Sequence, residues 1–560
     1  MAGRSSSLDR FYYLNNFELV LSALRERYLD LLSEEERGFM ARFGALPQVS
    51  RALLVRMAMR KGESFRASKL KYSEIGDVHA AAAPLLDAGW VDARPSLSVD
   101  ELQRLLTKAE LAGCFALPLR DHRKSDLIEA LRGRFAETKT FQDWIPGVQD
   151  CVFRLLAAPL CERFRLMFFG NFHQGWEEFV LADLRIFAYE RIASPLQSRA
   201  FRARADIDAF QQLKRCSELL HAGEPPELVA RAAPPSALGC DWLEDRRQRL
   251  MFDIARHHER GGDSASALAM YAACTHPGAR MRVIRLHQRA RRWEAAWTLC
   301  LSALAAPEDE SERQQVRRLL PRLDRKLGVS SDIGPCTSSV PSFELVLGAP
   351  PAGQAVEWQV RECLAQGMPE GASVHYVENG LVISLFGLLC WRAIFAPVPG
   401  AFFHDFHRGP ADLSSGQFCL RRAGEFAACL AELESGHYRT TIRQTYAKKL
   451  GIQSPFVAWN LVSESLVEKA LTCFPPAHLK CWFEWIVRDI QLNRAGFPDL
   501  VQFWPREQRY RMIEVKGPGD RLQDNQRRLL EFCASRQMPV AVCYVRRAGS
   551  MREAHELHHA

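Results

Sequence analysis

The chain has 560 residues, too many for one hydrophobic core, so its length indicates roughly three to five domains. Hydrophobic residues make up 47% and charged residues 25%, which is typical of a folded soluble protein and excludes a disordered or fibrous chain. The net charge of +8 favours an anionic partner, but only weakly, because the charge is spread over a large surface.

Cysteine usage and the first residues favour a reducing compartment. The sixteen cysteines are scattered, no two have C-x-x-C spacing, and Met1–Arg10 is polar, unlike a signal peptide. We therefore expect reduced thiols and a cytoplasmic, nucleoid-associated protein. The apolar run Leu381–Phe403 is interrupted by Arg392 and two prolines. Its unbroken part is about 11 residues, against about 20 needed to cross a bilayer, so it predicts a buried helix and no membrane contact.

Residues 1–135 are predicted to form an N-terminal DNA-binding region. The first 60 residues carry apolar side chains at helical spacing: Phe17, Leu19, Leu21, Leu24, Tyr28, Leu31 and Leu32. Residues 65–95 suit a small winged-helix unit that ends near Trp90. Residues 97–134 follow the pattern helix, helix, basic turn, helix. Cations there could neutralise phosphates without reading base sequence, and the candidates are Lys108, Arg120, Arg123 and Lys124.

The middle of the chain is also predicted to be helical. Residues 136–225 are rich in aromatic side chains and indicate a packed helical connector. Residues 226–328 contain alanine-rich helical hairpins that suggest roughly two or three tetratricopeptide-like repeats. One of these helices carries six arginines without a neighbouring acid, and four of them, Arg282, Arg285, Arg289 and Arg292, share one face by their spacing. We predict phosphate contact at Arg282, Arg285 and Arg289; the alternative is an ordinary solvated face.

The composition changes after residue 328. Residues 329–342 are rich in serine, glycine and proline and predict a linker. Strand-like segments become frequent only beyond it, at Phe343–Leu347, Met512–Lys516 and Val540–Val545. The expected architecture is therefore multidomain, with a mostly α-helical N-terminal arm followed by an α/β domain over residues 343–560.

The stretch Gly496–Glu531 carries the strongest chemical signal. Asp499 opens a predicted hairpin whose second strand ends in Glu514, Val515 and Lys516. Because side chains alternate along a strand, Glu514 and Lys516 share one face and Val515 points to the other. A chance hairpin with a surface ion pair is the alternative. The following Gly-Pro-Gly turn leads into a helix that returns Gln526 toward the strand end.

This grouping suits metal-dependent phosphodiester cleavage. Carboxylates such as Asp499 and Glu514, with a backbone carbonyl, form a hard oxygen site for Mg²⁺ or Mn²⁺. A metal ion there polarises the phosphate and lowers the pKa of an attacking water. The adjacent Lys516 can orient that water or offset charge that develops on the phosphate. The sequence therefore predicts a metal-dependent DNA nuclease with Asp499, Glu514 and Lys516 as its catalytic residues.

These residues resemble the VRR-NUC branch of the PD-(D/E)xK nucleases and, more closely, the bacterial Fanconi-associated nucleases. Val377–Phe395 resembles the helix that opens the family's nuclease domain, residues 97–134 its SAP-type segment, and residues 240–326 its tetratricopeptide-like domain. The resemblance implies a structure-specific 5′-flap endonuclease and 5′–3′ exonuclease in interstrand crosslink repair. Its implied partners are branched or flapped double-stranded DNA and repair proteins. Its implied metal ligands are Glu378, Asp499, Glu514 and the carbonyl of Val515, with Lys516 catalytic and Gln526 supporting.

The chain also departs from the larger family members. They place basic residues just before the motif glutamine and eight positions before the motif aspartate, where this chain has Asn525 and Gln491. The resemblance therefore does not imply that this chain has a pocket for the 5′ phosphate of the DNA. Two other functions stay open: a junction resolvase or restriction-type nuclease of the same superfamily, and a non-catalytic DNA-binding repair scaffold. The H-E-x-x-H pattern from His555 to His559 is better explained by a frayed tail than by zinc catalysis.

Overall fold

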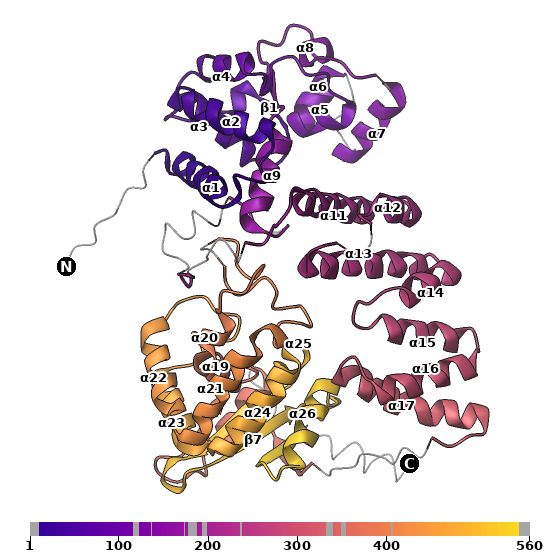
Figure 1. The fold of residues 1–560 in the computed structure, drawn as a ribbon, viewed down its shortest axis with the longest axis vertical. Helices are drawn as coiled ribbons and strands as arrows, with labels where there is room; N and C mark the ends of the chain where they lie inside the picture. Colours follow the sequence, from indigo (N-terminus) through magenta and orange to yellow (C-terminus); the bar gives the residue numbers. More distant parts are fainter. Residues whose placement is uncertain are drawn as a thin grey trace, which may run out of the picture. The chain divides into compact units, whose positions relative to one another are not determined.

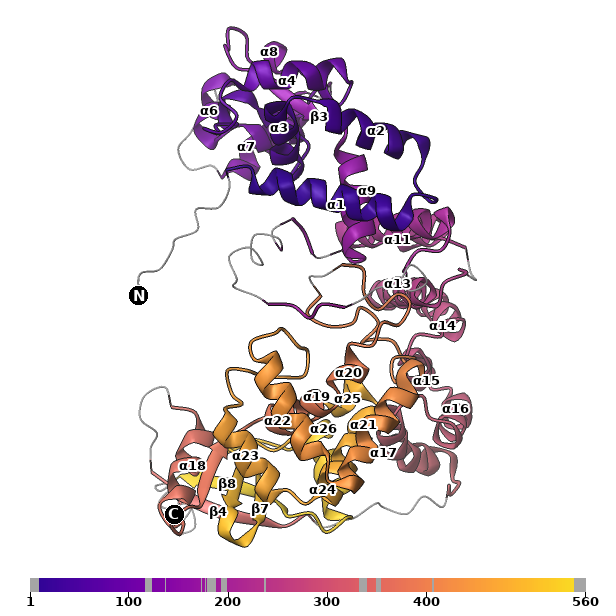
Figure 2. The same cartoon turned by 60° about the vertical axis from the view of Figure 1, so that its left-hand side comes forward.

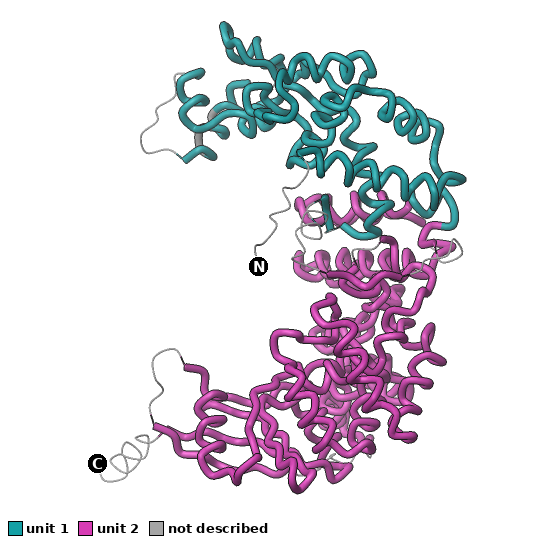
Figure 3. The backbone as a smooth tube through the Cα atoms, turned by 90° about the vertical axis from the view of Figure 1, so that its left-hand side faces the viewer, with its two compact units in different colours: residues 1–186, 202–207 teal, residues 187–201, 208–560 magenta. Residues whose placement is uncertain are grey.

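The computed structural model describes residues 10–115, 123–135, 137–172, 174–176, 178, 188–192, 199–235, 238–331, 340–348, 354–404 and 407–547. The chain divides into two compact units (Figure 3). Unit 1 comprises Met1–Ile186 and Arg202–Ile207, and unit 2 comprises Phe187–Phe201 and Asp208–Ala560. Arg120 and the C-terminal histidine motif lie outside the described residues, as does most of the predicted linker.

Unit 1 begins with helices that pack on a small sheet. The helices are α1 (Tyr12–Tyr28), α2 (Glu34–Ala45), α3 (Gln48–Ala58) and α4 (Val78–Asp87). Strands β1 (Ser64–Arg66), β3 (Val152–Leu155) and β2 (Val91–Asp92) form an antiparallel sheet in the order β1-β3-β2. The predicted winged-helix unit is thus present, but its central strand comes from a segment for which we predicted helices. Leu19, placed by its spacing among the core residues of α1, is 50% exposed.

A second helical cluster in unit 1 follows the wing. It contains α5 (Val99–Leu105), α6 (Lys108–Cys114), α7 (Lys124–Arg134) and α8 (Phe141–Trp144), and α9 (Ala158–Phe169) follows β3. Capping boxes start two of these helices, Ser98 with Glu101 at α5 and Thr107 with Glu110 at α6. Leu102, Leu131 and Trp144 lie in the apolar centre of the cluster. The three helices predicted for residues 97–134 are confirmed as α5, α6 and α7, while most of the predicted basic turn lies outside the described residues.

Unit 2 opens with helices that pack in succession, each on the next. The first of them, α11 (Arg204–Ala222), begins in unit 1 and continues into unit 2. It is followed by α12 (Pro226–Ala232), α13 (Asp241–Arg260), α14 (Ser264–Ala272), α15 (Ala279–Arg289), α16 (Trp293–Ala305) and α17 (Glu310–Leu327) (Figure 1). Small residues such as Ala267 and Ala296 are fully buried where neighbouring helices meet. The predicted helical hairpins are confirmed, and their assignment as tetratricopeptide-like repeats stays a prediction.

A five-stranded mixed sheet follows in unit 2. Its strands are β4 (Ser342–Leu347), β5 (Ser373–Tyr376), β6 (Leu500–Trp504), β7 (Arg509–Lys516) and β8 (Val540–Arg547), in the order β4-β8-β7-β6-β5. β6 pairs antiparallel with β5 and β7, joined to β7 through η4 (Pro505–Glu507), while β8 pairs parallel with β4 and β7. The three predicted strands and the predicted hairpin are confirmed.

Helices cover both faces of this sheet. On one face α18 (Val356–Ala365) packs against Ile513 and Val515. The other face carries a large apolar core (Figure 2). Its helices are α19 (Leu381–Leu389), α20 (Trp391–Ile394), α21 (Ala423–Ser435), α22 (Tyr438–Lys449), α23 (Glu464–Cys473), α24 (Pro476–Arg488), α25 (Ile490–Asn493) and α26 (Asp524–Ala534). The short helix η3 (Leu420–Arg422) directly precedes α21. Every residue of α19 is buried, so the apolar run is a core helix as predicted. None of the helices described here is long and apolar enough to cross a membrane.

Candidate active site

The β6–β7 hairpin brings the predicted catalytic residues together. Leu500 pairs with Ile513 in the sheet register, so Asp499 lies at the start of β6 next to Glu514 near the end of β7. An Asp499 carboxylate oxygen accepts a hydrogen bond of 2.8 Å from the backbone N–H of Val515. Lys516 Nζ lies 2.8 Å from Glu514 Oε1. Strand alternation therefore produces the shared face of Glu514 and Lys516 that the sequence predicted.

The predicted supporting residue also reaches this site. Lys516 Nζ donates a 3.0 Å hydrogen bond to Oε1 of Gln526, in the first turn of α26. The same oxygen accepts from the backbone N–H of Gln523 at 2.9 Å, which closes a capping box at the helix start. Because this cap fixes the Gln526 side chain, the position of Lys516 is tied to the N-terminus of α26.

Glu378 approaches the site from a turn after β5. The backbone N–H groups of Val377 and Glu378 both donate to the carbonyl of Asp499, at 2.8 and 3.2 Å. The Glu378 carboxylate accepts a hydrogen bond from the Tyr376 hydroxyl. We had expected Glu378 on a helix, but α19 begins only at Leu381 because Asn379 has a left-handed backbone, with φ of +47°. The structure thus brings Glu378, Asp499, Glu514 and Lys516 together.

Burial and mutual repulsion perturb both central carboxylates. The pKa of Asp499 is raised to about 6, chiefly by burial and also by the charges of Glu357 and Glu378, while the hydrogen bond from the Val515 N–H opposes the rise. The pKa of Glu514 is raised to about 7, chiefly by burial and then by the Asp499 charge, while Lys516 opposes the rise. A nearby cation would stabilise the ionised forms of these acids, because the charge of one lysine cannot offset the charges of several carboxylates.

The donor set fits a hard divalent cation. Glu514 is fully buried, and apart from the ion pair with Lys516 neither of its oxygens has a hydrogen-bond partner among the described residues. Asp499 is also buried and uses one oxygen for the Val515 N–H. Buried oxygens of this kind have a partner when a metal ion is bound, and Mg²⁺ and Mn²⁺ prefer carboxylate, carbonyl and water oxygens.

Sequence reasoning missed two residues at this site. Glu357, in the first turn of α18, adds negative charge next to Asp499. Nothing in the local sequence indicates this, because α18 is far from the motif along the chain. Tyr376 contacts Glu378 and stacks on Trp358, with ring centroids 5.6 Å apart. Strand alternation could have suggested Tyr376, since it lies two residues before Glu378.

The predicted DNA-contact residues of unit 1 differ in their exposure and in their hydrogen bonds. Lys124 Nζ donates to the backbone carbonyls of Gln103 and Leu106 at 2.6 and 2.8 Å, so it joins α7 to α5. Arg123 is exposed and Lys108 is half-buried at the start of α6. DNA contact by these residues stays a prediction.

The sequence predicted that the arginine cluster of α15 has no acidic neighbour, and this prediction is wrong. Glu259 of α13 lies 3.4 Å from Arg282 and 2.8 Å from Arg289, and Arg285 donates to Gln315 of α17 at 2.7 Å. Arg292 does not share their face, because α15 ends at Arg289. The acids come from neighbouring helices and are invisible in the local sequence. Phosphate contact by Arg282, Arg285 and Arg289 stays a prediction.

Family comparisons agree with this architecture. Residues 11–92 match the FAN1 HTH domain, residues 96–144 the Fanconi anemia-associated nuclease SAP domain, and residues 433–547 the VRR-NUC domain. The last match includes Asp499, Glu514, Lys516 and Gln526. The fold and the acid–lysine hairpin thus define a DNA nuclease of the PD-(D/E)xK type, whose chemistry depends on a divalent metal.

Whole-chain comparisons give the family. The chain is 51% identical over 544 residues to the Fanconi-associated nuclease 1 homolog of Pseudomonas aeruginosa, covering 96% of each chain. It is 21% identical over 652 residues to Fanconi-associated nuclease 1 of Homo sapiens and spans 63% of that protein. A solved structure of paFAN1 bound to 2-nt 5′-flap DNA with a gap matches with a TM-score of 0.91, at 51% identity and covering 96% of this chain and 99% of that one. The chain belongs to the Fanconi-associated nuclease 1 family and is a structure-specific DNA nuclease.

Proposed function

We propose that this nuclease cuts 5′-flap DNA and degrades DNA in the 5′–3′ direction, using Mg²⁺ or Mn²⁺, in the repair of interstrand crosslinks in the cytoplasm. The flap substrate is supported by two similar structures, described as paFAN1 bound to 5′-flap DNA with one-nucleotide and two-nucleotide flaps and a gap. Their 51% identity to this chain and TM-scores of 0.90 and 0.91 make a shared substrate the simplest expectation. Repair proteins are proposed as further partners.

The proposed metal site uses four groups of this chain. Glu378, Asp499, Glu514 and the carbonyl of Val515 would hold the ion, which when bound polarises the scissile phosphate and acidifies an attacking water. The Val515 N–H fixes one Asp499 oxygen at 2.8 Å and leaves the other for the ion. The Tyr376 hydroxyl in the same way restrains one oxygen of Glu378.

Lys516 is proposed to act on the phosphate and the water. An ammonium group has three N–H donors. Glu514, at 2.8 Å, and Gln526, at 3.0 Å, occupy two of them, which leaves one for a substrate oxygen or the attacking water. Because Lys516 is only 7% exposed, its charge acts in a medium of low polarity, where it offsets developing negative charge more strongly than it would in water.

One observation carries this proposal: the buried Glu514 carboxylate has no described hydrogen-bond partner, while Asp499 and Lys516 lie beside it. The test is cleavage of 5′-flap DNA with Mn²⁺ or Mg²⁺ by the wild type and by Asp499→Ala, with and without a 5′ phosphate. A four-way junction and a blunt duplex of the same sequence serve as comparison substrates. Cutting near the flap junction that Asp499→Ala abolishes is the expected result.

Three other results would contradict the proposal. Preference for the four-way junction would favour a resolvase. Binding of flap DNA without a metal-dependent cut would favour a scaffold. Cleavage by Asp499→Ala at the wild-type rate would contradict the assignment of the active site. Lys480→Ala is a control, because the Lys480 side chain is 38% exposed and pairs with Glu434 rather than with a residue of the proposed site.

A further inference from the structure

Three side chains with metal-binding groups meet among the helical hairpins of unit 2. They are Glu227 in the first turn of α12, His258 near the end of α13, and Asp263, the N-cap residue of α14. Each offers one ligand atom, and the three atoms lie within 4.8 Å of one another. All three residues precede the sheet and helices of the candidate active site in the chain, so a metal ion here would be distinct from the ion proposed there.

The turn between α13 and α14 fixes two of these side chains. The backbone N–H of Asp263 donates to the carbonyl of His258 at 3.0 Å, and Gly262 between them has φ of +87°. Oδ1 of Asp263 accepts from the backbone N–H of Ser266 at 3.0 Å, which caps α14. The other oxygen, Oδ2, lies 3.3 Å from Nδ1 of His258. The helix cap therefore leaves one carboxylate oxygen facing the imidazole.

The His258 imidazole is buried against two carboxylates. It is only 5% exposed, and the described residues give its ring no hydrogen-bond or ion-pair partner besides Asp263 and Glu227. Oε1 of Glu227 lies 3.6 Å from Nδ1, the same nitrogen that faces Asp263. Because Nδ1 carries at most one proton, it can donate to only one of these two oxygens. A metal ion between the three atoms would bind both carboxylates and the imidazole together.

The distances indicate which metal ion fits. Zn²⁺ binds imidazole nitrogen and carboxylate oxygen at about 2.0–2.2 Å in a tetrahedral site, so neighbouring ligand atoms lie about 3.3–3.5 Å apart. The two separations measured from Nδ1 of His258 are 3.3 and 3.6 Å. Mg²⁺ in an octahedral site would place neighbouring ligands about 2.9 Å apart, and it prefers oxygen to imidazole. The geometry and the donor set therefore favour Zn²⁺.

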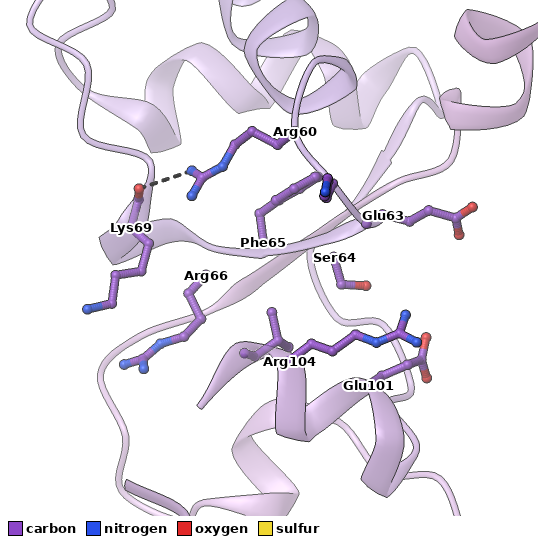
Figure 4. Close-up of a pocket in the computed structure, with 11 residues that line it drawn as sticks. Arg60, Glu63, Ser64, Phe65, Arg66, Lys69, Glu101 and Arg104 are labelled. Carbon is purple, nitrogen blue, oxygen red and sulfur yellow. Dashed lines mark hydrogen bonds between the residues drawn. The ribbon is translucent and has the colours of Figure 1, made fainter. Parts of the chain in front are cut away.

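The charged pocket of unit 1 has the opposite chemistry. This pocket has a volume of about 520 Å³, and its cations Arg60, Arg66 and Lys69 gather at one end (Figure 4). Its lining contains neither His nor Cys, so it does not suit a transition metal. By contrast, no lysine or arginine of the described chain forms an ion pair with Glu227 or Asp263. The negative charge around His258 is therefore available to a metal cation.

We propose that Glu227, His258 and Asp263 bind Zn²⁺ through Oε1, Nδ1 and Oδ2, with water as the fourth ligand. The Glu227 and Asp263 side chains are 58% and 45% exposed, so solvent reaches the fourth position and Glu227 can rotate to close the site. The bound ion links α12 to the turn between α13 and α14 and stabilises this part of the helical hairpins.

The test is metal binding by the full chain carrying Asp499→Asn and Glu514→Gln, which weaken the candidate active site as a competing metal site. Co²⁺ is the first probe, because a tetrahedral Co²⁺ site has strong visible absorption bands that six-coordinate Co²⁺ lacks. We expect one equivalent of Co²⁺ to produce these bands and Zn²⁺ to remove them by displacement. Zn²⁺ should also raise the melting temperature of this parent chain, because it binds the folded state.

Two variants of the parent chain remove ligands in different ways. His258→Gln removes the imidazole, and Asp263→Asn removes a charge while it keeps a side chain that caps helices. Each should lose the tetrahedral bands and bind Zn²⁺ at least about tenfold more weakly than the parent chain. The matched control is His257→Gln with Glu224→Gln, which changes one imidazole and one acid outside the site and should bind like the parent chain.

The histidines near the C-terminus are the subject of a second control. His555→Gln with His558→Gln and His559→Gln removes those imidazoles and should leave the bands unchanged. The proposal is overturned if the parent chain shows no tetrahedral bands, if His258→Gln and Asp263→Asn retain them, or if either control loses them. Thermal melting of each variant without metal identifies misfolding, and if His258→Gln does not fold, the result for Asp263→Asn decides.

Discussion

Lys516 Nζ donates a 3.0 Å hydrogen bond to Oε1 of Gln526, linking the end of β7 to the start of α26. Gln526→Ala removes this acceptor, so the ammonium loses one of its two fixed contacts. A hydrogen bond to a charged group contributes about 1.5–3 kcal/mol, which sets an expected loss of roughly tenfold to a hundredfold in the single-turnover cleavage rate. Binding of flap DNA should not change.

The matched control for that substitution is Arg527→Ala, one residue further along α26. If both variants cut equally fast, the contact has no role in the reaction. Gln526 also closes the helix cap through Gln523, so thermal melting must accompany the rate measurement.

Tyr376 is expected to position Glu378 for the metal. Tyr376→Phe removes only the hydroxyl that donates to Glu378, and the stacking on Trp358 is kept. The freed carboxylate should bind metal less tightly, raising the Mn²⁺ concentration for half-maximal cleavage by about three- to tenfold, as for the loss of one hydrogen bond of about 1 kcal/mol. Calorimetric titration of Mn²⁺ should show the same weakening.

Tyr544→Phe is the control for this experiment, because Tyr544 is an exposed tyrosine of β8. Equal Mn²⁺ requirements in wild type and Tyr376→Phe would show that the hydroxyl does not position Glu378.

The raised pKa values of Asp499 and Glu514 predict that the metal-free protein loses stability as pH rises. Their pKa values of about 6 and about 7 exceed the ordinary range because of burial and mutual repulsion. The folded state therefore binds more protons than the unfolded state between about pH 4 and pH 7, and stability falls across that window. Thermal melting in chelator should show a smaller fall for Asp499→Asn with Glu514→Gln than for the wild type.

Added Mn²⁺ should reverse this pH dependence, because metal binding needs the ionised carboxylates. If the melting temperatures of the wild type and the double variant changed equally between pH 5 and pH 8, burial of the two ionised acids would have no effect on stability.

Gly496 is expected to tolerate no side chain. Its φ is +97°, and an added Cβ would lie 2.8 Å from the backbone carbonyl carbon of Asn525, next to Gln526. Gly496→Ala should destabilise the fold by more than the roughly 1–2 kcal/mol cost of the left-handed backbone alone, and should slow cleavage by shifting α26. Gly519→Ala shares the positive φ, at +88°, but meets open space. Similar urea unfolding midpoints for both variants would show that contact between the added Cβ and Asn525 does not lower the free energy of unfolding.

The parts of the site that the sequence predicted are those set by local geometry. Asp499, Glu514 and Lys516 lie on one hairpin, where strand alternation decides which side chains share a face. Gln526 follows from a short turn into a helix. Glu378 was predicted only through resemblance, because its approach depends on hydrogen bonds from a distant turn to the Asp499 carbonyl.

The features that could not be predicted from the sequence depend on tertiary contacts. Glu259, which forms ion pairs with Arg282 and Arg289, belongs to another helix, so the arginine stripe looked uncompensated. Strand β3 was missed because a four-residue strand gains its stability from pairing with β1 and β2, far away in the chain.

The most direct test of the active-site assignment is single-turnover cleavage of 5′-flap DNA in Mn²⁺ by the wild type and Lys516→Ala, at enzyme concentrations that saturate binding. The account predicts a loss of at least about a hundredfold in rate, because a buried charge beside the reacting phosphate is removed, with flap binding unchanged. Cleavage by Lys516→Ala at the wild-type rate would contradict it.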